Sequence, residues 1–249
     1  MAACSDHPSS CERPAPCCCG SAEQDLRDAR SRRPGADSVE LRYSCGVRIA
    51  ILTFDGFNEL DSFIALGLLN RLGNLGWKAE ITSPSALITS MNGVTVQAQQ
   101  PLEFANDADA VIFGSGIYTR AIAQNSALLD RLQLDPLRQL IGAQCSGALL
   151  LARLGLLADM PACTDLTTKP WLVEAGVRVE DAPFHARGPI ATAGGCLSAQ
   201  YLAAWMMARS AGIDAAAQAL HYAAPVGEKD AYVERLLAVV RPFLPDAAV

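Results

Sequence analysis

The sequence predicts an α/β fold with a mostly parallel sheet whose two faces are both covered by helices. Two observations lead to this prediction: short apolar runs alternate with stretches of helical periodicity, and the apolar runs contain few polar residues. Strands that are apolar throughout fit a sheet buried on both faces, which is typically a parallel one. In such sheets chemistry gathers beyond the carboxyl ends of the strands. The residues that directly follow each predicted strand are therefore the first candidates for a functional site.

The predicted elements follow one another from residue 47 to residue 244. The β-branched run "VRIAILTF" (47–54) predicts a buried strand, and the helical spacing of 58–76, which ends in glycine, predicts a helix. An Asn-Gly pair inside 87–99 predicts a hairpin. The other predicted strands are 77–83, 107–116, 139–144 and 189–195, and the other predicted helices are 120–124, 126–138, 146–157, 197–212, 214–222 and 230–244.

Composition and charge argue against nucleic-acid and membrane partners and indicate the cellular location. The chain has 249 residues, a net charge of -6 and a pI near 5.1, and its lysines are scattered, so we expect no nucleic-acid partner. No apolar run reaches the roughly 18–20 residues that cross a bilayer, and the start lacks a secretory pattern, so we expect no membrane partner. Nine cysteines, an odd number, fit reduced thiols and a cytoplasmic location.

The chain divides into two regions. Residues 1–44 are rich in Ser, Pro, Arg and Asp without a periodic apolar face, which predicts a disordered extension or one that begins at an upstream start codon. Residues 45–249 form the predicted α/β domain. The extension holds His7 and five cysteines, but their spacing does not match the paired C-x-x-C pattern of a zinc site. Those cysteines are Cys4, Cys11, Cys17, Cys18 and Cys19.

Cys145 lies between the predicted strand "LIGAQ" and the predicted helix "SGALLL". This strand-turn-helix arrangement is that of a nucleophile elbow, which exposes the side chain above the sheet. The helix dipole would then lower the pKa of the thiol, and backbone N–H groups at Ser146 and Gly147 would face a developing oxyanion. The alternative is that Cys145 is one more small buried hydrophobic residue.

Two further segments lie at the same predicted edge of the sheet. Glu59 and Asp61 follow the first strand, and a carboxyl group on an otherwise apolar helix face would be partly buried, with a raised pKa. The alternative is an ordinary acidic helix start. The glycines of "GSG", Gly114 and Gly116, end another strand and either bring a backbone N–H to the site or form a simple tight turn.

Together these motifs resemble the ThiJ/PfpI family of the class I glutamine amidotransferase-like superfamily. The resemblance rests on "VRIAILTFDGF", the "LD" acid, "VIFGSG", "QCSGALLLARLGLL", a later "CT" and "ATAGG" in this order, from about Val47 to Pro242. It implies a flavodoxin-like three-layer sandwich and a homodimer. It also implies Cys145 as the reactive thiol, Asp61 as its protonated carboxyl partner, and Gly116 and Ser146 as oxyanion donors.

Within this family the "LD" pair is similar to the isonitrile hydratase branch, which implies hydration of an isonitrile to an N-substituted formamide without metal or organic cofactor. Where the protease, glyoxalase and amidase branches carry histidine after threonine, this chain has Asp165. An aspartate cannot replace imidazole at neutral pH, and its charge would raise the pKa of the cysteine. We therefore expect neither proteolysis nor glyoxalase activity. Two other functions remain open: a redox sensor or chaperone-like protein that uses an oxidisable Cys145, and a ligand-sensing domain of a transcription regulator.

Four other residues attract attention. Cys196 repeats the strand-to-helix placement of Cys145 and is either a second reactive thiol or structural. Cys163 is expected in the core. His185 is expected in a loop, and His221 on a helix, with a packing or surface role.

Overall fold

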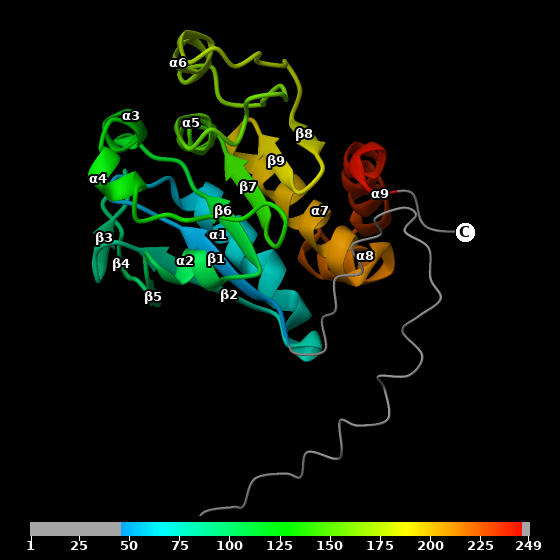
Figure 1. Ribbon diagram of the computed structural model, residues 1–249. Coiled ribbons are helices and arrows are strands. Elements are labelled where there is room, and N and C mark those ends of the chain that lie inside the picture. Colours follow the sequence, from blue (N-terminus) through cyan, green and yellow to red (C-terminus); the bar gives the residue numbers. More distant parts are fainter. Residues whose placement is uncertain (1–45, 246–249) are drawn as a thin grey trace, which may run out of the picture. The chain divides into compact units, whose positions relative to one another are not determined.

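The computed structural model describes residues 46–245; the predicted extension, residues 1–44, lies outside this range. Figure 1 shows a central sheet between two layers of helices. The strands are β1 (Arg48–Leu52), β2 (Lys78–Ser83), β3 (Leu87–Thr89), β4 (Thr95–Gln97), β5 (Gln100–Pro101), β6 (Ala110–Phe113), β7 (Leu140–Gln144), β8 (Phe184–Arg187) and β9 (Ile190–Ala193). The α-helices are α1 (Glu59–Leu69), α2 (Phe104–Asp107), α3 (Thr119–Ala123), α4 (Ser126–Leu129), α5 (Gly147–Arg153), α6 (Lys169–Glu174), α7 (Ala199–Ala211), α8 (Ile213–Ala223) and α9 (Lys229–Val240). The 3-10 helices are η1 (Asn70–Leu75), η2 (Cys196–Ser198) and η3 (Arg241–Phe243).

The main sheet has the strand order β5-β2-β1-β6-β7-β9-β8, and every pair is parallel except β8 with β9. This is the flavodoxin-like α/β architecture that the sequence predicted. The strands β1, β6, β7 and β9 are neighbours, so their carboxyl ends meet along one stretch of the sheet edge. The segments that follow these four strands carry Asp61, Ser115, Cys145 and Cys196, which the fold therefore places together.

Each face of the sheet has its own hydrophobic core, because side chains of a strand alternate between the faces. On β1, Ile49 and Ile51 belong to the core that α1, α7, α8 and α9 cover, whereas Ala50 and Leu52 belong to the core that α2 to α6 cover. Among the described residues, Trp205 of α7 is the largest fully buried side chain. Within residues 46–245, no helix combines the length and the apolar character needed to cross a membrane.

Several local predictions are confirmed. The Asn92-Gly93 turn joins β3 to β4 in an antiparallel pair. The glycine that ends the first helical stretch, Gly76, has φ +79°, the left-handed conformation expected where a helix stops. Cys163 is fully buried, as expected of a core residue, and His221 lies on α8 at the surface.

Two local predictions are wrong. The helix expected over 126–138 ends at Leu129, and beyond it the N–H groups of Gln133 and Asp135 donate to the side chains of Asn106 and Gln139. Pro136 also disfavours helical geometry at Asp135. His185 is not in a loop but in β8, the antiparallel edge strand that the sequence did not reveal. Its Nδ1 lies 2.9 Å from a carboxylate oxygen of Glu180, and its ring meets Phe243 edge-on. This pairing gives His185 a structural role.

Candidate active site

Cys145 occupies a strained turn between β7 and α5. Its φ of +47° is positive, and among residues 46–245 it is the only non-glycine residue with that feature. A conformation of this kind costs about 1–3 kcal/mol and persists only where neighbours fix it. Here the Cys145 N–H donates to the Ala193 carbonyl (2.8 Å) and the Thr164 hydroxyl donates to the Cys145 carbonyl (2.8 Å). The geometry is that of a nucleophile elbow.

Gly147, the first residue of α5, lets the elbow close against the end of β6. A Cβ atom at this position would lie 2.5 Å from the carbonyl oxygen of Phe113 and 2.8 Å from that of Gly114. We expect Gly147→Ala to lower the free energy of unfolding by about 1–3 kcal/mol, because both obstacles are backbone atoms. Urea titration measures the change. Gly67→Ala in α1, where nothing lies within 4 Å, is the control and should stabilise slightly; an equal response of the two variants would contradict the prediction.

Asp61 lies on α1 with its side chain fully buried. The hydroxyl of Ser115, from the segment after β6, donates to Oδ2, while Oδ1 has no hydrogen-bond partner. Burial raises the pKa of Asp61, as the sequence led us to expect. Ser115 first, and then the thiols of Cys145 and Cys196, lower the pKa by donating to the carboxylate, but they oppose only part of that rise. Glu59, the other acidic candidate, is partly buried and its carboxylate accepts hydrogen bonds from Ser90 and Asn92 of the hairpin. Asp61 is thus the carboxyl group of the site.

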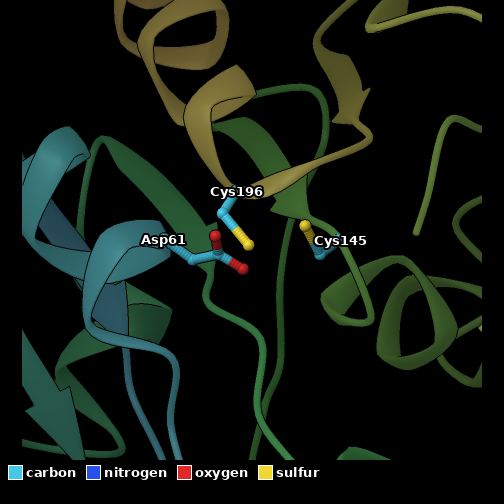
Figure 2. Close-up of side chains that lie close together, drawn as sticks. All are labelled: Asp61, Cys145 and Cys196. Atoms are coloured by element: carbon cyan, nitrogen blue, oxygen red, sulfur yellow. The ribbon is translucent and has the colours of Figure 1, made fainter. Parts of the chain in front are cut away.

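Cys196 completes a cluster that the sequence left open. One carboxylate oxygen of Asp61 and the sulfur atoms of Cys145 and Cys196 all lie within 4.8 Å of one another. Figure 2 shows the three side chains converging from α1, from the elbow and from η2. We name these three residues the thiol–acid cluster. Both sulfurs accept hydrogen bonds from neutral amides: Asn58 Nδ2 lies 3.0 Å from Cys196 Sγ, and Gln144 Nε2 lies 3.5 Å from Cys145 Sγ.

Neither amide could be assigned to the site from the sequence. Each makes one hydrogen bond to a sulfur atom and a second one to the backbone, and both depend on the fold. Asn58 begins α1, its Oδ1 accepting from the Leu60 N–H at 3.1 Å, and therefore positions the helix that carries Asp61. Gln144 ends β7, and its amide also donates to the Gly195 carbonyl at 2.7 Å. Gln144 thus ties the elbow to the loop of Cys196.

The thiol of Cys145 is not activated as the sequence predicted. Burial raises its pKa well above the usual value, and the negative charge of Asp61 and the neighbouring Cys196 raise it further. The predicted lowering by the helix dipole is wrong because Cys145 as a whole residue is only 3% exposed and acidic groups surround its thiol. The pKa of Cys196 is raised as well, first by its burial and then by Asp61. The cluster therefore holds its protons tightly.

Asp165 stands near the cluster but is engaged elsewhere. Its carboxylate accepts from the backbone N–H groups of Thr167 and Thr168, both at 2.9 Å, and from the Thr168 hydroxyl at 2.8 Å. These bonds fix the turn that leads into α6. As expected, its charge contributes to the raised pKa of Cys145, although it is the smallest of the causes.

The predicted oxyanion donors lie at the site, with one complication. The Gly116 N–H donates to the Ser146 hydroxyl at 3.2 Å, and that hydroxyl donates to Thr119 Oγ1 at 2.9 Å. The Gly116 amide thus already has a partner, which an incoming oxygen would have to replace. An oxyanion role for Gly116 and Ser146 stays a prediction.

A cavity of about 390 Å³ opens onto Cys145. Polar and apolar side chains share its wall, and none of the described residues that form it is Lys, Arg or His. The wall consists of Asn58, Met91, Ser115, Gly116, Ile117, Cys145, Ser146, Asp165, Thr167, Thr168, Trp171 and Cys196. The sequence did not point to Met91 of the hairpin turn or Trp171 of α6, because only the folded chain brings them over the elbow.

Comparison with known proteins gives a family match that covers both the elbow and Asp61. The model of the DJ-1/PfpI family matches residues 47–209, more than half of the chain. A search of curated proteins gives no significant match. Among solved structures, a variant of the DJ-1 superfamily protein STM1931 from Salmonella typhimurium is 24% identical with a TM-score of 0.62, over 72% of this chain and 99% of that one.

Two other similar structures represent different kinds of protein. Toxoplasma gondii DJ-1, in an oxidized form, is 19% identical with a TM-score of 0.60, over 71% of this chain and 97% of that one. An AraC family transcriptional regulator from Pseudomonas putida is 17% identical with a TM-score of 0.59, over 72% and 100%. Likeness at this level shows a common fold. Together with the family match over the elbow and the acid, it leads to one conclusion: the chain belongs to the DJ-1/PfpI family.

Proposed function

We propose that this chain is a cysteine-dependent enzyme that hydrates a small isonitrile to an N-substituted formamide. The observation that carries the proposal is the pairing of Cys145, on its strained elbow, with the buried carboxyl group of Asp61. Cys145 lines a cavity whose described wall contains no histidine. Thiol hydrolases of the triad type need an imidazole base. The site therefore favours a reaction in which one thiol and one acid are sufficient.

Isonitrile hydration is such a reaction, because the terminal carbon must receive both a nucleophile and a proton. The sulfur of Cys145 bonds to that carbon, and the carbon takes a proton from the thiol–carboxyl pair, which gives a thioimidate, R–N=CH–S. Water then adds to the same carbon while the nitrogen is protonated, with Asp61 carrying the proton. The C–S bond breaks, the formamide leaves, and the sulfur regains its proton. The sum is isonitrile plus water giving formamide.

The cavity supports a small substrate with an apolar substituent. Its volume of about 390 Å³ lies at the low end of ligand pockets. Ile117, Met91 and Trp171 provide apolar surface around Cys145. A neutral isonitrile needs no basic side chain for binding. The family resemblance also favours a homodimer as the working form.

The test is incubation with small alkyl isonitriles and detection of the formamide by NMR. We expect turnover by the unmodified chain and a loss of at least about 1,000-fold in Cys145→Ala, since the nucleophile is gone. Cys163→Ala removes another buried thiol, outside the cluster, and should leave turnover intact. Unchanged formamide production by Cys145→Ala, or none by the unmodified chain, would rule the proposal out.

A redox sensor is the second candidate, and the unpaired Asp61 Oδ1 favours it. Two equivalents of hydrogen peroxide would convert the Cys145 thiol to a sulfinic acid and release two of water. A protonated Asp61 would then donate to a sulfinate oxygen. Mass spectrometry after mild peroxide distinguishes the two functions: addition of two oxygens at Cys145, without isonitrile turnover, would support sensing.

A further inference from the structure

We propose that Asp61, Cys145 and Cys196 form a three-ligand site for Zn²⁺, with the fourth position open to the cavity. This assignment revises the expectation, drawn from the family resemblance, that the site takes no metal. It does not depend on the proposed enzyme activity, because it follows from the donor atoms and their surroundings.

The donor geometry suits a tetrahedral ion. The three donor atoms come from different parts of the chain and lie within 4.8 Å of one another. Zinc–sulfur bonds of about 2.3 Å and zinc–oxygen bonds of about 2.0–2.2 Å place donors about 3.3–3.8 Å apart. Side-chain rotations that move the donor atoms by about 1 Å would therefore close the site around an ion. Figure 2 shows that the carboxyl group and the Cys196 sulfur already point toward the same space.

A second observation independently points to a ligand. Oδ1 of Asp61 is buried without a hydrogen-bond partner, although Oδ2 is held by Ser115. An unpaired buried oxygen costs about 1–3 kcal/mol, more when it is charged. A cation bound at Oδ1 would remove this cost. It would also compensate the negative charge that the three groups carry when ionised. The described wall of the adjoining cavity, which includes Cys145 and Cys196, contains no Lys, Arg or His.

The surrounding groups fit thiolate ligands. Metal-bound thiolates accept hydrogen bonds from an outer shell that orients them. Asn58 Nδ2 already donates to Cys196 Sγ, and Gln144 Nε2 to Cys145 Sγ.

The donor set also selects the metal. Two thiolates favour Zn²⁺ or Cu⁺, while the carboxylate favours the divalent ion. Three protein ligands with one open position is the arrangement of catalytic rather than structural zinc. Because zinc would occupy the Cys145 sulfur, metal binding and attack by that sulfur exclude each other.

Cobalt titration tests the site directly, since thiolate-to-Co²⁺ charge transfer gives a near-ultraviolet band that needs no enzyme activity. The full chain is used with the cysteines outside the described range replaced by serine, so that they contribute no signal. These are Cys4, Cys11, Cys17, Cys18, Cys19 and Cys45. We expect the band to saturate at one equivalent of Co²⁺ and to disappear when Zn²⁺ is added.

The variants separate ligands from neighbours. Asn58→Ala should weaken binding by about 10- to 100-fold, the usual cost of losing an outer-shell partner. Cys196→Ala and Asp61→Asn should weaken it more, whereas Cys163→Ala should bind normally. No thiolate–cobalt band, or a band unaffected by Cys196→Ala, would overturn the proposal.

A measurement on the unmodified chain covers the case in which the variants fail to fold. Zn²⁺ should protect Cys145 and Cys196, but not Cys163, from alkylation, as read by peptide mass spectrometry. Equal alkylation with and without Zn²⁺ would also overturn the site. Because neither experiment uses an isonitrile, failure of the proposed enzyme activity would leave both results readable.

Discussion

Asp61→Asn should make the protein more stable at neutral pH while it strongly slows isonitrile hydration. Burial raises the pKa of Asp61 in the folded state above its unfolded value of about 3.9. At pH 7 folding must therefore either bind a proton or bury a charge, and each costs free energy. Asparagine removes this cost while its side-chain oxygen can still accept from Ser115. We expect a gain of between about 1 and 4 kcal/mol at pH 7, the upper value being that of full protonation.

The sign of the pH dependence follows from the direction of the shift. A group whose pKa is raised on folding contributes stability below its unfolded pKa, and this contribution is lost as the pH rises through the folded pKa. The two proteins should thus be similar in stability below about pH 4, and the asparagine variant should gain its advantage above that pH. Urea unfolding at several pH values measures the difference, and the formamide assay should show a loss of about 10²- to 10⁴-fold.

Asp165→Asn is the matched control, with the opposite expected sign. Asp165 accepts three hydrogen bonds from Thr167 and Thr168, so its replacement should destabilise the turn before α6. If Asp61→Asn lowered stability at pH 7 as Asp165→Asn does, the buried carboxyl group would be a structural element rather than a costly functional one.

The sequence predicted the position of Cys145 because local signals define an elbow: an apolar strand, one cysteine, then small residues opening a helix. It predicted Asp61 from a similar signal, since the acid lies at the start of the helix that follows the first strand. Strand order is a long-range property, however, and only the neighbouring positions of β1, β6, β7 and β9 bring Ser115 and Cys196 to the same point. From the sequence, Cys196 could therefore be identified as a candidate, but its proximity to Cys145 and Asp61 could not be predicted.

The wrong prediction of a lowered Cys145 pKa has a similar origin. A helix dipole can be read from the sequence, whereas burial and the number of acidic neighbours depend on packing. Here three acidic groups converge, and desolvation outweighs the end of the short helix α5. The edge strand β8 was missed because "FHAR" has only four residues, too few for its alternation of buried and more exposed side chains to stand out.

The pH profile of Cys145 alkylation should show a midpoint above the ordinary thiol value of about 8.5. The cause is burial first, then the charge of Asp61. In Asp61→Asn the midpoint should fall, and alkylation at pH 7.5 should accelerate about threefold for each unit by which the pKa falls, because a lower pKa also makes the thiolate less nucleophilic. Asp165→Asn should change the rate less. Iodoacetamide labelling after chelator treatment, followed by peptide mass spectrometry, measures each cysteine separately.

Cys163 provides an internal reference in the same experiment, because burial raises its pKa to about 12 and it lies outside the cluster. A wild-type midpoint at or below 8.5 would contradict the expected direction and return Cys145 to the class of thiolate nucleophiles. The combination of faster alkylation and lost hydration in Asp61→Asn separates two mechanisms. An enzyme limited by thiolate would gain activity as its thiol ionised more easily. An enzyme that delivers both the sulfur and a proton to the same carbon would lose activity, because the Asp61 carboxyl group that carries the proton is gone.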